Sequence, residues 1–179
     1  MTIYTVGHST LALDAFEALL DRHGIAGIVD VRRYPRSRRH PQFDTDALAR
    51  ALRDTGRAYD WLSALGGRRA PRPDSPHIGW QVEGFRGYAD HMESPEFARG
   101  LADLLEIAAK HPTAVMCAEA VPWRCHRRLL ADALLVRGID VRHVVGPRNA
   151  EAHTLTPFAR VEGARIVYDV TQTPRLPGL

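Results

Sequence analysis

Short apolar runs alternate along the chain with longer segments in which apolar residues recur every three or four positions. Leu13, Phe16 and Leu20, for example, form a stripe of helical spacing. Alternation of this kind predicts strands joined by helices, and strands that are apolar at nearly every position are typical of parallel sheets covered on both faces. The expected strands lie at residues 3–6, 25–31, 58–62, 113–117 and 139–145. We therefore predict an α/β three-layer sandwich, with a mostly parallel sheet of about five strands and helices on both faces.

Capping residues mark the expected helix ends. We expect Ser9 or Thr10 to cap the first helix and Gly24 to end it. Asp44 is expected to cap the second helix, and Ser94, followed by proline, to cap a later one.

Two segments do not follow the strand–helix alternation. Residues 63–87 are rich in glycine and proline and are expected to form a long loop, either a lid or binding loop or a simple insertion. Residues 154–170 are expected to form a terminal β-hairpin that turns at Gly163. The length of 179 residues suits one domain, so we assign residues 1–179 to a single domain.

Composition narrows the class of protein. No apolar run approaches the roughly 20 residues of a membrane helix, and no signal peptide is evident, so we expect a cytoplasmic protein with no membrane partner. The two cysteines are expected to be free in a reducing compartment. The net charge is only +3, but five arginines fall within residues 32–39.

Polar, reactive side chains follow the predicted strands repeatedly. They are Gly7-His8-Ser9 after the first strand, Asp30, Arg32 and Arg33 at the second, and Cys117 and Glu119 at the fourth. Because ligands of parallel α/β sheets bind outside the carboxyl ends of the strands, we expect one pocket there.

Residues 117–128 read as a strand, a turn and a helix start, where backbone N–H groups and the helix dipole favour an anion. Cys125 lies closest to the helix start and is the better nucleophile candidate, because such a place stabilises a thiolate. Cys117 fits a core position more readily than a reactive one. His126 and Arg127 fit an anion site or a helix-capping and salt-bridge role equally well.

The remaining candidates each have a structural alternative. Glu119 and Asp30 are general acid or base candidates, or partners of arginines. His8 is a base candidate, and Ser9 fits a helix cap better than a nucleophile. We expect four reactive residues: Cys125, Glu119, Asp30 and His8. We expect the ligand to be bound by Gly7, Ser9, Arg32, Arg33, Arg36, Cys117, His126 and Arg127.

Two further chemistries fit the sequence less well. The spacing from Cys117 to Arg124 is one residue longer than a thiolate phosphate loop of phosphatases, and Glu119 within it would repel the ligand; a rhodanese-like sulfur transfer meets the same objection. Cys117, Cys125 and His126 lack the paired spacing of zinc sites, so no metal or other cofactor is expected. The basic segment 32–43, with its aromatics and prolines, suits phosphates and bases, or is simply a solvated loop.

Taken together, the motifs resemble a bacterial family catalogued as domain of unknown function 488. The resemblance rests on residues 3–10, 29–38, 41–43, 65–67, 84–90, 117–119, 125–127 and 157–162. It implies an α/β fold with Gly-His-Ser, Asp-Val-Arg, Cys-x-Glu and Cys-His-Arg as signature positions, and it supplies no substrate. Ala120-Val121 departs from the charged residue expected there.

Three functions follow as hypotheses. The first is an enzyme acting on a phosphate- or nucleotide-bearing substrate, either free or within nucleic acid. The second is a non-catalytic nucleic-acid or nucleotide-binding module, whose affinity would fall steeply with salt. The third is a structural or partner-binding domain with a large apolar patch and no pocket.

Overall fold

The computed structural model describes residues 1–169. Its strands are β1 (Thr2–Gly7), β2 (Gly27–Asp30), β3 (Ala58–Trp61), β4 (Thr113–Cys117), β5 (Asp140–Val144), β6 (Glu151–Ala152), β7 (Ala159–Glu162) and β8 (Arg165–Tyr168). Its helices are α1 (Leu13–Arg22), α2 (Thr45–Asp54), α3 (Glu83–His91), α4 (Pro95–Ala108) and α5 (Arg127–Leu135).

The main sheet has six strands in the order β3-β2-β4-β1-β5-β6. The first five are parallel, and β6 pairs antiparallel with β5. The predicted mostly parallel sheet is therefore confirmed. The sixth strand was not predicted, because a strand of two residues carries no apolar pattern.

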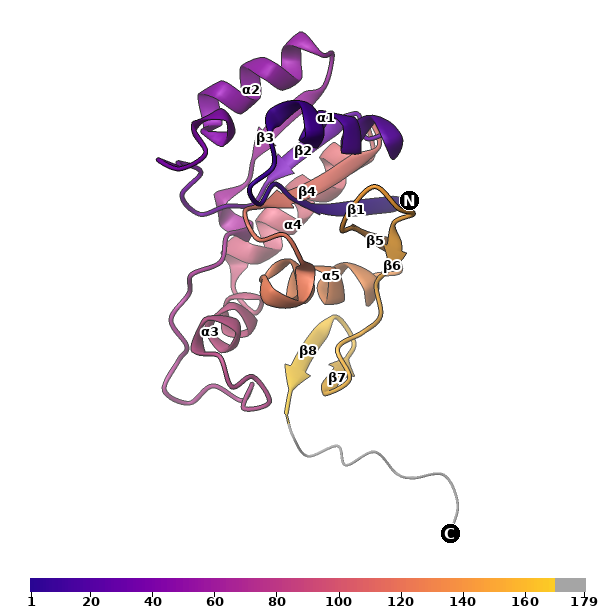
Figure 1. Cartoon of the computed structure of the whole chain (residues 1–179). Coiled ribbons are helices and arrows are strands. Elements are labelled where there is room, and N and C mark those ends of the chain that lie inside the picture. The colour runs from indigo at the N-terminus through magenta and orange to yellow at the C-terminus, as the bar shows by residue number, and fades with distance from the viewer. Residues whose placement is uncertain (170–179) are drawn as a thin grey trace.

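Helices cover both faces of this sheet, as predicted (Figure 1). Phe16 of α1 and Leu52 of α2 pack in one apolar cluster, while Leu104 of α4 and Leu130 of α5 pack in the other. β4 lies between them with all five residues buried, which explains its uninterrupted apolar sequence.

Helix α1 does not begin as expected. Its N-cap position is Ala12, so neither Ser9 nor Thr10 caps it, and that prediction was wrong. Ser9 instead adopts a left-handed backbone, with φ of 47°, and its N–H donates to the carbonyl of Ala118 at 2.9 Å. The end of β1 is thus bound to the segment after β4, which delays the helix by a turn.

The other two caps were placed correctly in the chain. Ser94 Oγ accepts a hydrogen bond from the Phe97 N–H at 3.1 Å. Asp44 occupies the N-cap of α2, but its carboxylate accepts from the N–H of Ser37 at 2.5 Å instead of from the helix. Asp44 therefore shapes the basic loop that precedes it.

The predicted long loop ends earlier than residue 87, because α3 begins at Glu83. Glycine disfavours helices, so Gly84 and Gly87 concealed this one. Gly87 is needed for packing: a Cβ there would lie 2.1 Å from the carbonyl oxygen of Arg69. Residues 83–87 were therefore wrongly assigned to the loop.

The terminal hairpin forms from β7 and β8, and Gly163 turns with φ of 63°. Residue 170, the last of the predicted hairpin range, lies outside the described residues. The buried carboxylate of Asp132, on α5, accepts hydrogen bonds from the Tyr168 hydroxyl (2.9 Å) and the Thr156 N–H (3.0 Å), and its Oδ1 lies 2.8 Å from His153 Nε2. These contacts bind the C-terminal segment to α5.

Within residues 1–169, none of the helices combines the length and the hydropathy needed to span a bilayer.

Candidate functional site

The strand order places a crevice at the carboxyl ends of β1, β4 and β2. From β1 the chain continues to α1 on one face, whereas from the neighbouring strand β4 it continues to α5 on the opposite face. Loops that diverge in this way leave a gap between them, which is where ligands of open α/β sheets bind.

A cavity of about 470 Å³ occupies this position, within the size range of small-molecule sites. Its walls come from the segments after β1, β2 and β4, from the long loop before α3 and from the first turn of α3. The lining residues are His8, Ser9, Arg32, Arg33, Tyr34, Arg36, Ser37, His40, Gly67, Arg68, Val82, Gly84, Phe85, Cys117, Ala118, Glu119, Arg124, Cys125 and His126.

Most of the residues proposed from the sequence line this cavity, while Gly7, Asp30 and Arg127 lie outside its lining. Gly7 has a packing role there. A Cβ at this position would lie 1.9 Å from the backbone oxygen of Glu119, so only glycine allows β1 to approach the segment after β4. The adjacent His8 N–H donates to the carbonyl of Cys117 at 3.1 Å.

Asp30 and Arg32 form a buried ion pair at the end of β2. The Arg32 Nη2 lies 2.6 Å from Asp30 Oδ2, and the side chains are 7% and 0% exposed. The carboxylate also accepts from the Tyr59 hydroxyl at 2.8 Å, and Arg32 Nη2 donates to the carbonyl of Phe43 at 2.7 Å. Asp30 is thus fully engaged, and what it does is hold Arg32 at the cavity wall.

His8 is a neutral ring stacked on Phe43, with the ring centroids 4.2 Å apart. Burial and the nearby Arg32 guanidinium lower the pKa of His8 to about 4. Its Nδ1 lies 3.0 Å from the carbonyl oxygen of Ser9 and its Nε2 lies 3.2 Å from Arg32 Nη1. Nδ1 therefore carries the proton, and Nε2 accepts from Arg32.

The two cysteines lie together and differ in charge. The sulfur atoms of Cys117 and Cys125 are within 4.8 Å of each other. The hydrogen bond with Cys125, reinforced by burial, raises the pKa of the Cys117 thiol well above its usual range. The same hydrogen bond, assisted by His126 and Arg127 and opposed by burial, lowers the pKa of Cys125 well below its usual range. These directions, together with the contact of Arg127 Nε with Cys125 Sγ at 3.3 Å, favour Cys125 over Cys117 as the thiolate of the pair.

Arg127 explains why the charge rests on Cys125. Its side chain is buried, with the residue only 1% exposed, and its Nε lies 3.3 Å from Cys125 Sγ. Its Nη2 donates to the backbone oxygen of Glu119. Among residues 1–169 no carboxylate lies within ion-pair distance of this guanidinium. A buried cation without a counter-charge is costly, and the Cys125 thiolate is the anion beside it.

His126 completes the surroundings of the thiolate. Its Nδ1 lies 3.7 Å from Cys125 Sγ, and its ring packs against Tyr88 with centroids 4.9 Å apart. Glycine at position 67 makes room for this ring, since a Cβ there would lie 2.7 Å from His126 Nδ1. The Leu-Gly-Gly motif of the long loop is therefore part of the site.

Uncompensated positive charge surrounds the cavity mouth. Arg33, Arg36, Arg68 and Arg124 line it, and none of the four has an ion-pair partner within the described part of the chain. Glu119 contributes the only carboxylate to this lining, and it is exposed. Four guanidinium groups without acidic partners, in a lining with one carboxylate, suit an anionic ligand.

Cys117, Cys125 and His126 are also the residues that could hold a metal ion, since their ligand atoms lie within 4.8 Å of one another. Two thiolates and an imidazole are ligands that zinc accepts. The guanidinium of Arg127 already supplies positive charge to Cys125, and its repulsion of a dication disfavours metal binding.

The spacing from Cys117 to Arg124 does not build a phosphate loop around Cys117. The raised pKa leaves this thiol protonated, and Arg124 ends a 3₁₀ turn (Pro122–Arg124) before α5 begins. The anionic sulfur belongs to Cys125, which follows that turn.

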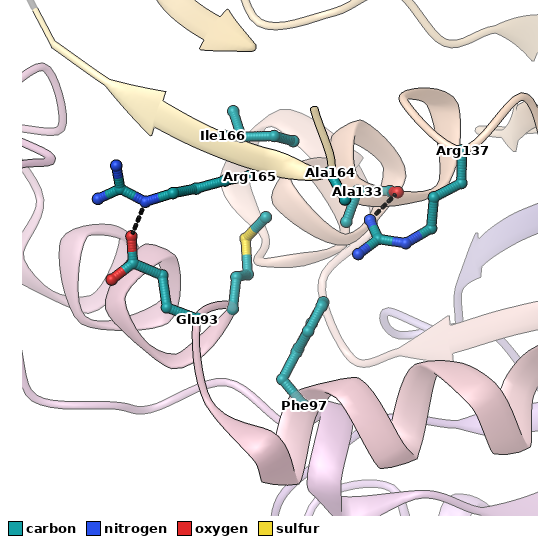
Figure 2. Close-up of a pocket in the computed structure, with 8 residues that line it drawn as sticks. Glu93, Phe97, Ala133, Arg137, Ala164, Arg165 and Ile166 are labelled. Carbon is teal, nitrogen blue, oxygen red and sulfur yellow. Dashed lines mark hydrogen bonds and ion pairs between the residues drawn. The ribbon is translucent and has the colours of Figure 1, made fainter. Parts of the chain in front are cut away.

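A second cavity, of about 400 Å³, lies between α4, α5 and the hairpin (Figure 2). Glu93 pairs there with Arg165 at 2.8 Å, and Arg137 donates to the carbonyl of Ala133 at 2.7 Å. Its lining contains no cysteine or histidine, so it offers neither a nucleophile nor a proton-transfer group of neutral pKa.

Several residues that line the first cavity were not among the candidates predicted from the sequence. Tyr34 and His40 lie in the basic segment, which was recognised as a whole. Arg68 and Val82 come from the long loop, whose role was left open. A left-handed backbone at Arg68, with φ of 59°, has no local sequence signal.

The chain matches the protein family described as Domain of unknown function DUF488 over residues 12–134, which is more than half of its length. It belongs to the DUF488 family. The match confirms the resemblance seen in the sequence and includes Asp30, Cys117, Glu119 and Cys125, whereas His8 precedes the matched DUF488 range. A search of curated proteins found no match, and neither did a search of solved structures.

Proposed function

We propose that this DUF488 protein is an enzyme in which the Cys125 thiolate attacks an electrophilic atom of a phosphate-bearing substrate. The bond from that atom to the leaving group breaks as the bond to sulfur forms, and the leaving group departs with the electron pair and takes up a proton from Glu119 or water. One observation carries the proposal: Arg127 is buried without a carboxylate partner among residues 1–169, and Cys125 lies 3.3 Å from it in an arginine-lined cavity. Keeping a cysteine ionised at neutral pH is the usual way to activate it as a nucleophile.

The other residues divide into binding and proton transfer. Arg33, Arg36, Arg68 and Arg124 bind the anionic part of the substrate, because they lack acidic partners and line the mouth. Glu119 is the candidate proton donor or acceptor, since its exposed carboxylate is the only one in the lining. Cys117 donates its S–H to Cys125 and keeps that sulfur anionic.

Asp30 and His8 are positioning residues in this proposal. Asp30 is 0% exposed and all its contacts go to neighbouring protein groups. His8 is neutral and accepts from Arg32. Asp30 orients the Arg32 guanidinium from outside the cavity lining, whereas His8 accepts from Arg32 within the lining, so both act on binding through Arg32.

The test is the rate of alkylation of each thiol by iodoacetamide as a function of pH, followed by mass spectrometry of the intact chain. We expect rapid labelling of Cys125 well below pH 8 and slow labelling of Cys117. Inorganic phosphate and mononucleotides should protect Cys125. Cys125→Ser should lose the fast phase, and Cys117→Ser should retain it.

Slow labelling of both cysteines below pH 8 would reject the nucleophile. Fast labelling without protection by any phosphate compound would reject the phosphate-bearing substrate. Protection by phosphate compounds with slow labelling would favour a non-catalytic binding module, which needs the arginines and not the thiolate.

A further inference from the structure

We infer that the substrate is one nucleotide of a single-stranded nucleic acid, which lies across the cavity mouth on Tyr34, Trp123 and the arginines of residues 32–39. The inference rests on the proposed function and names its substrate class. It is carried by charge that extends beyond the cavity and by aromatic side chains left exposed beside it.

The positive charge exceeds what one small anion needs. Arg33 and Arg36 line the cavity, but Arg38 and Arg39 of the same loop lie outside the lining and are exposed. None of these four has an ion-pair partner within residues 1–169, and residues 32–43 contain no acidic residue. Arginines outside the cavity lining can pair with phosphates other than the one bound in the cavity. A ligand with several phosphates, such as a nucleic acid strand, offers them.

Arginines elsewhere on the molecule are of two kinds: some form ion pairs, and others, such as Arg50 and Arg53 on α2, have no ion-pair partner within residues 1–169. Arg72, Arg160 and Arg165 are each paired with acidic side chains. What distinguishes the 32–39 loop is that four arginines without an ion-pair partner within residues 1–169 lie in one segment of eight residues, two of them in the cavity lining.

Two large exposed aromatic side chains belong to segments that line the cavity. Tyr34 lines the cavity and is 63% exposed, and Trp123, which precedes the cavity residue Arg124, is 52% exposed. Arg33 lies over the Tyr34 ring, 5.8 Å from its centroid. Exposed rings interleaved with arginines are the means by which proteins bind single strands, because each base stacks on a ring while its phosphate pairs with a cation.

The burial of Cys125 favours a single strand over a duplex as the ligand. Cys125 is 3% exposed, and only a group that enters the cavity reaches its sulfur. A nucleotide stacked and paired within a duplex cannot enter such a cavity unless it is extruded, whereas a single strand presents its nucleotides at little cost.

The experiment measures binding of the full chain to fluorescein-labelled oligothymidine and oligouridine by fluorescence anisotropy, with a duplex of equal length and thymidine monophosphate as competitors. At least one single strand should bind tighter than both competitors by about tenfold or more. Comparison of the two oligomers identifies whether the strand is DNA or RNA. Equal affinity for the duplex, or no gain over the mononucleotide, would overturn the inference.

Variants of residues outside the catalytic groups separate the contribution of the aromatic rings to oligonucleotide binding from that of the arginines. Tyr34→Ala and Trp123→Ala should each weaken oligonucleotide binding about fivefold or more, while Val161→Ala, an exposed apolar change on β7, should not. Arg38→Gln with Arg39→Gln should weaken binding and flatten its salt dependence by about 0.7 for each phosphate that is no longer neutralised. The matched control, Arg50→Gln with Arg53→Gln on α2, removes the same charge away from the cavity lining.

Loss of binding in the α2 control equal to that in the loop variant would overturn the inference, since the effect would then reflect net charge alone. Failure here is distinguishable from failure of the proposed function, because protection of Cys125 by inorganic phosphate or mononucleotides tests the cavity without the strand.

Discussion

Two buried arginines border the cavity region, and they have different counter-ions. Arg32 pairs with the carboxylate of Asp30, and Arg127 contacts the sulfur of Cys125. A carboxylate is anionic at neutral pH in most surroundings, so the first pair is a fixed support. A thiol is anionic only where its surroundings require it. In the proposed function, the charge of the second buried arginine activates a sulfur, whereas the charge of the first holds a carboxylate in the buried part of the fold.

The largest expected effect is a loss of stability when the ion pair of Asp30 and Arg32 is broken. Arg32→Met leaves the carboxylate of Asp30 buried without a cation, and we expect the free energy of unfolding to fall by about 3–5 kcal/mol. Urea denaturation measures this. Asp30→Asn added to Arg32→Met removes the orphaned charge and should recover part of the loss. A loss under about 1 kcal/mol in the single variant would show that the pair is not a structural support.

Separating Arg127 from Cys125 should lower the free energy of unfolding less than breaking the first pair does. It should, however, slow the reaction of Cys125 with alkylating reagents. In Arg127→Met the Cys125 sulfur can take up a proton at neutral pH, so the free energy of unfolding should fall by only about 1–2 kcal/mol. Alkylation of Cys125 near pH 7 should slow about tenfold or more, since each pKa unit is a factor of ten in thiolate. Arg128→Met is the matched control, because Arg128 donates to Thr156 Oγ1 and not to Cys125. Equal labelling rates in the two variants would contradict the assignment of Arg127.

His8, which lies beside the pair of Asp30 and Arg32, should make the stability of the protein depend on pH. Because its folded pKa of about 4 is below the unfolded value near 6.5, the unfolded state binds the proton more readily between these pH values. Its contribution to stability is thus complete above pH 6.5 and is lost as the pH falls toward 4. His8→Gln should reduce the fall by less than about 1.4 kcal/mol per pH unit, the limit for one proton.

The remaining fall in His8→Gln is expected to come in part from His143, whose pKa burial and His153 lower to about 4. Urea denaturation across this pH range checks both contributions. An unchanged pH profile in His8→Gln would show that the pKa of this ring is the same in the folded and unfolded states.

The smallest expected effect is on the labelling rate of Cys125 when Cys117 is replaced. The Cys117 thiol donates a hydrogen bond to the sulfur of Cys125 and so stabilises its anionic form. Cys117→Ala removes the donor to Cys125, so the pKa of Cys125 should rise and its labelling near pH 6 should slow a few-fold, as expected for about 1 kcal/mol of hydrogen bonding. Cys117→Ser keeps a donor and should restore most of the rate. If serine and alanine behave alike, the hydrogen bond does not support the thiolate.

The sequence predicted the structure best where the pattern of apolar residues is strong. Residues 113–117 are apolar throughout and form the buried strand β4, and the strand-end positions of His8, Arg32 and Cys117 follow from parallel pairing. Glycines within α3 concealed a helix that long-range packing stabilises, and β6 is too short to have a pattern. Which cysteine carries the charge, and whether Asp30 faces a ligand or Arg32, depends on contacts between side chains that the sequence pattern does not specify.

The contacts of Asp132 decide where this protein can be shortened. The matched DUF488 range ends at residue 134, yet the Asp132 carboxylate is 0% exposed and its hydrogen-bond partners among the described side chains come from residues 153–168. A fragment cut at residue 134 would retain this charge with none of those partners, and it would lack β5 beside β1. Expression of the family range alone should therefore yield an unstable fragment, and a fusion or crystallisation fragment needs the chain through at least Tyr168.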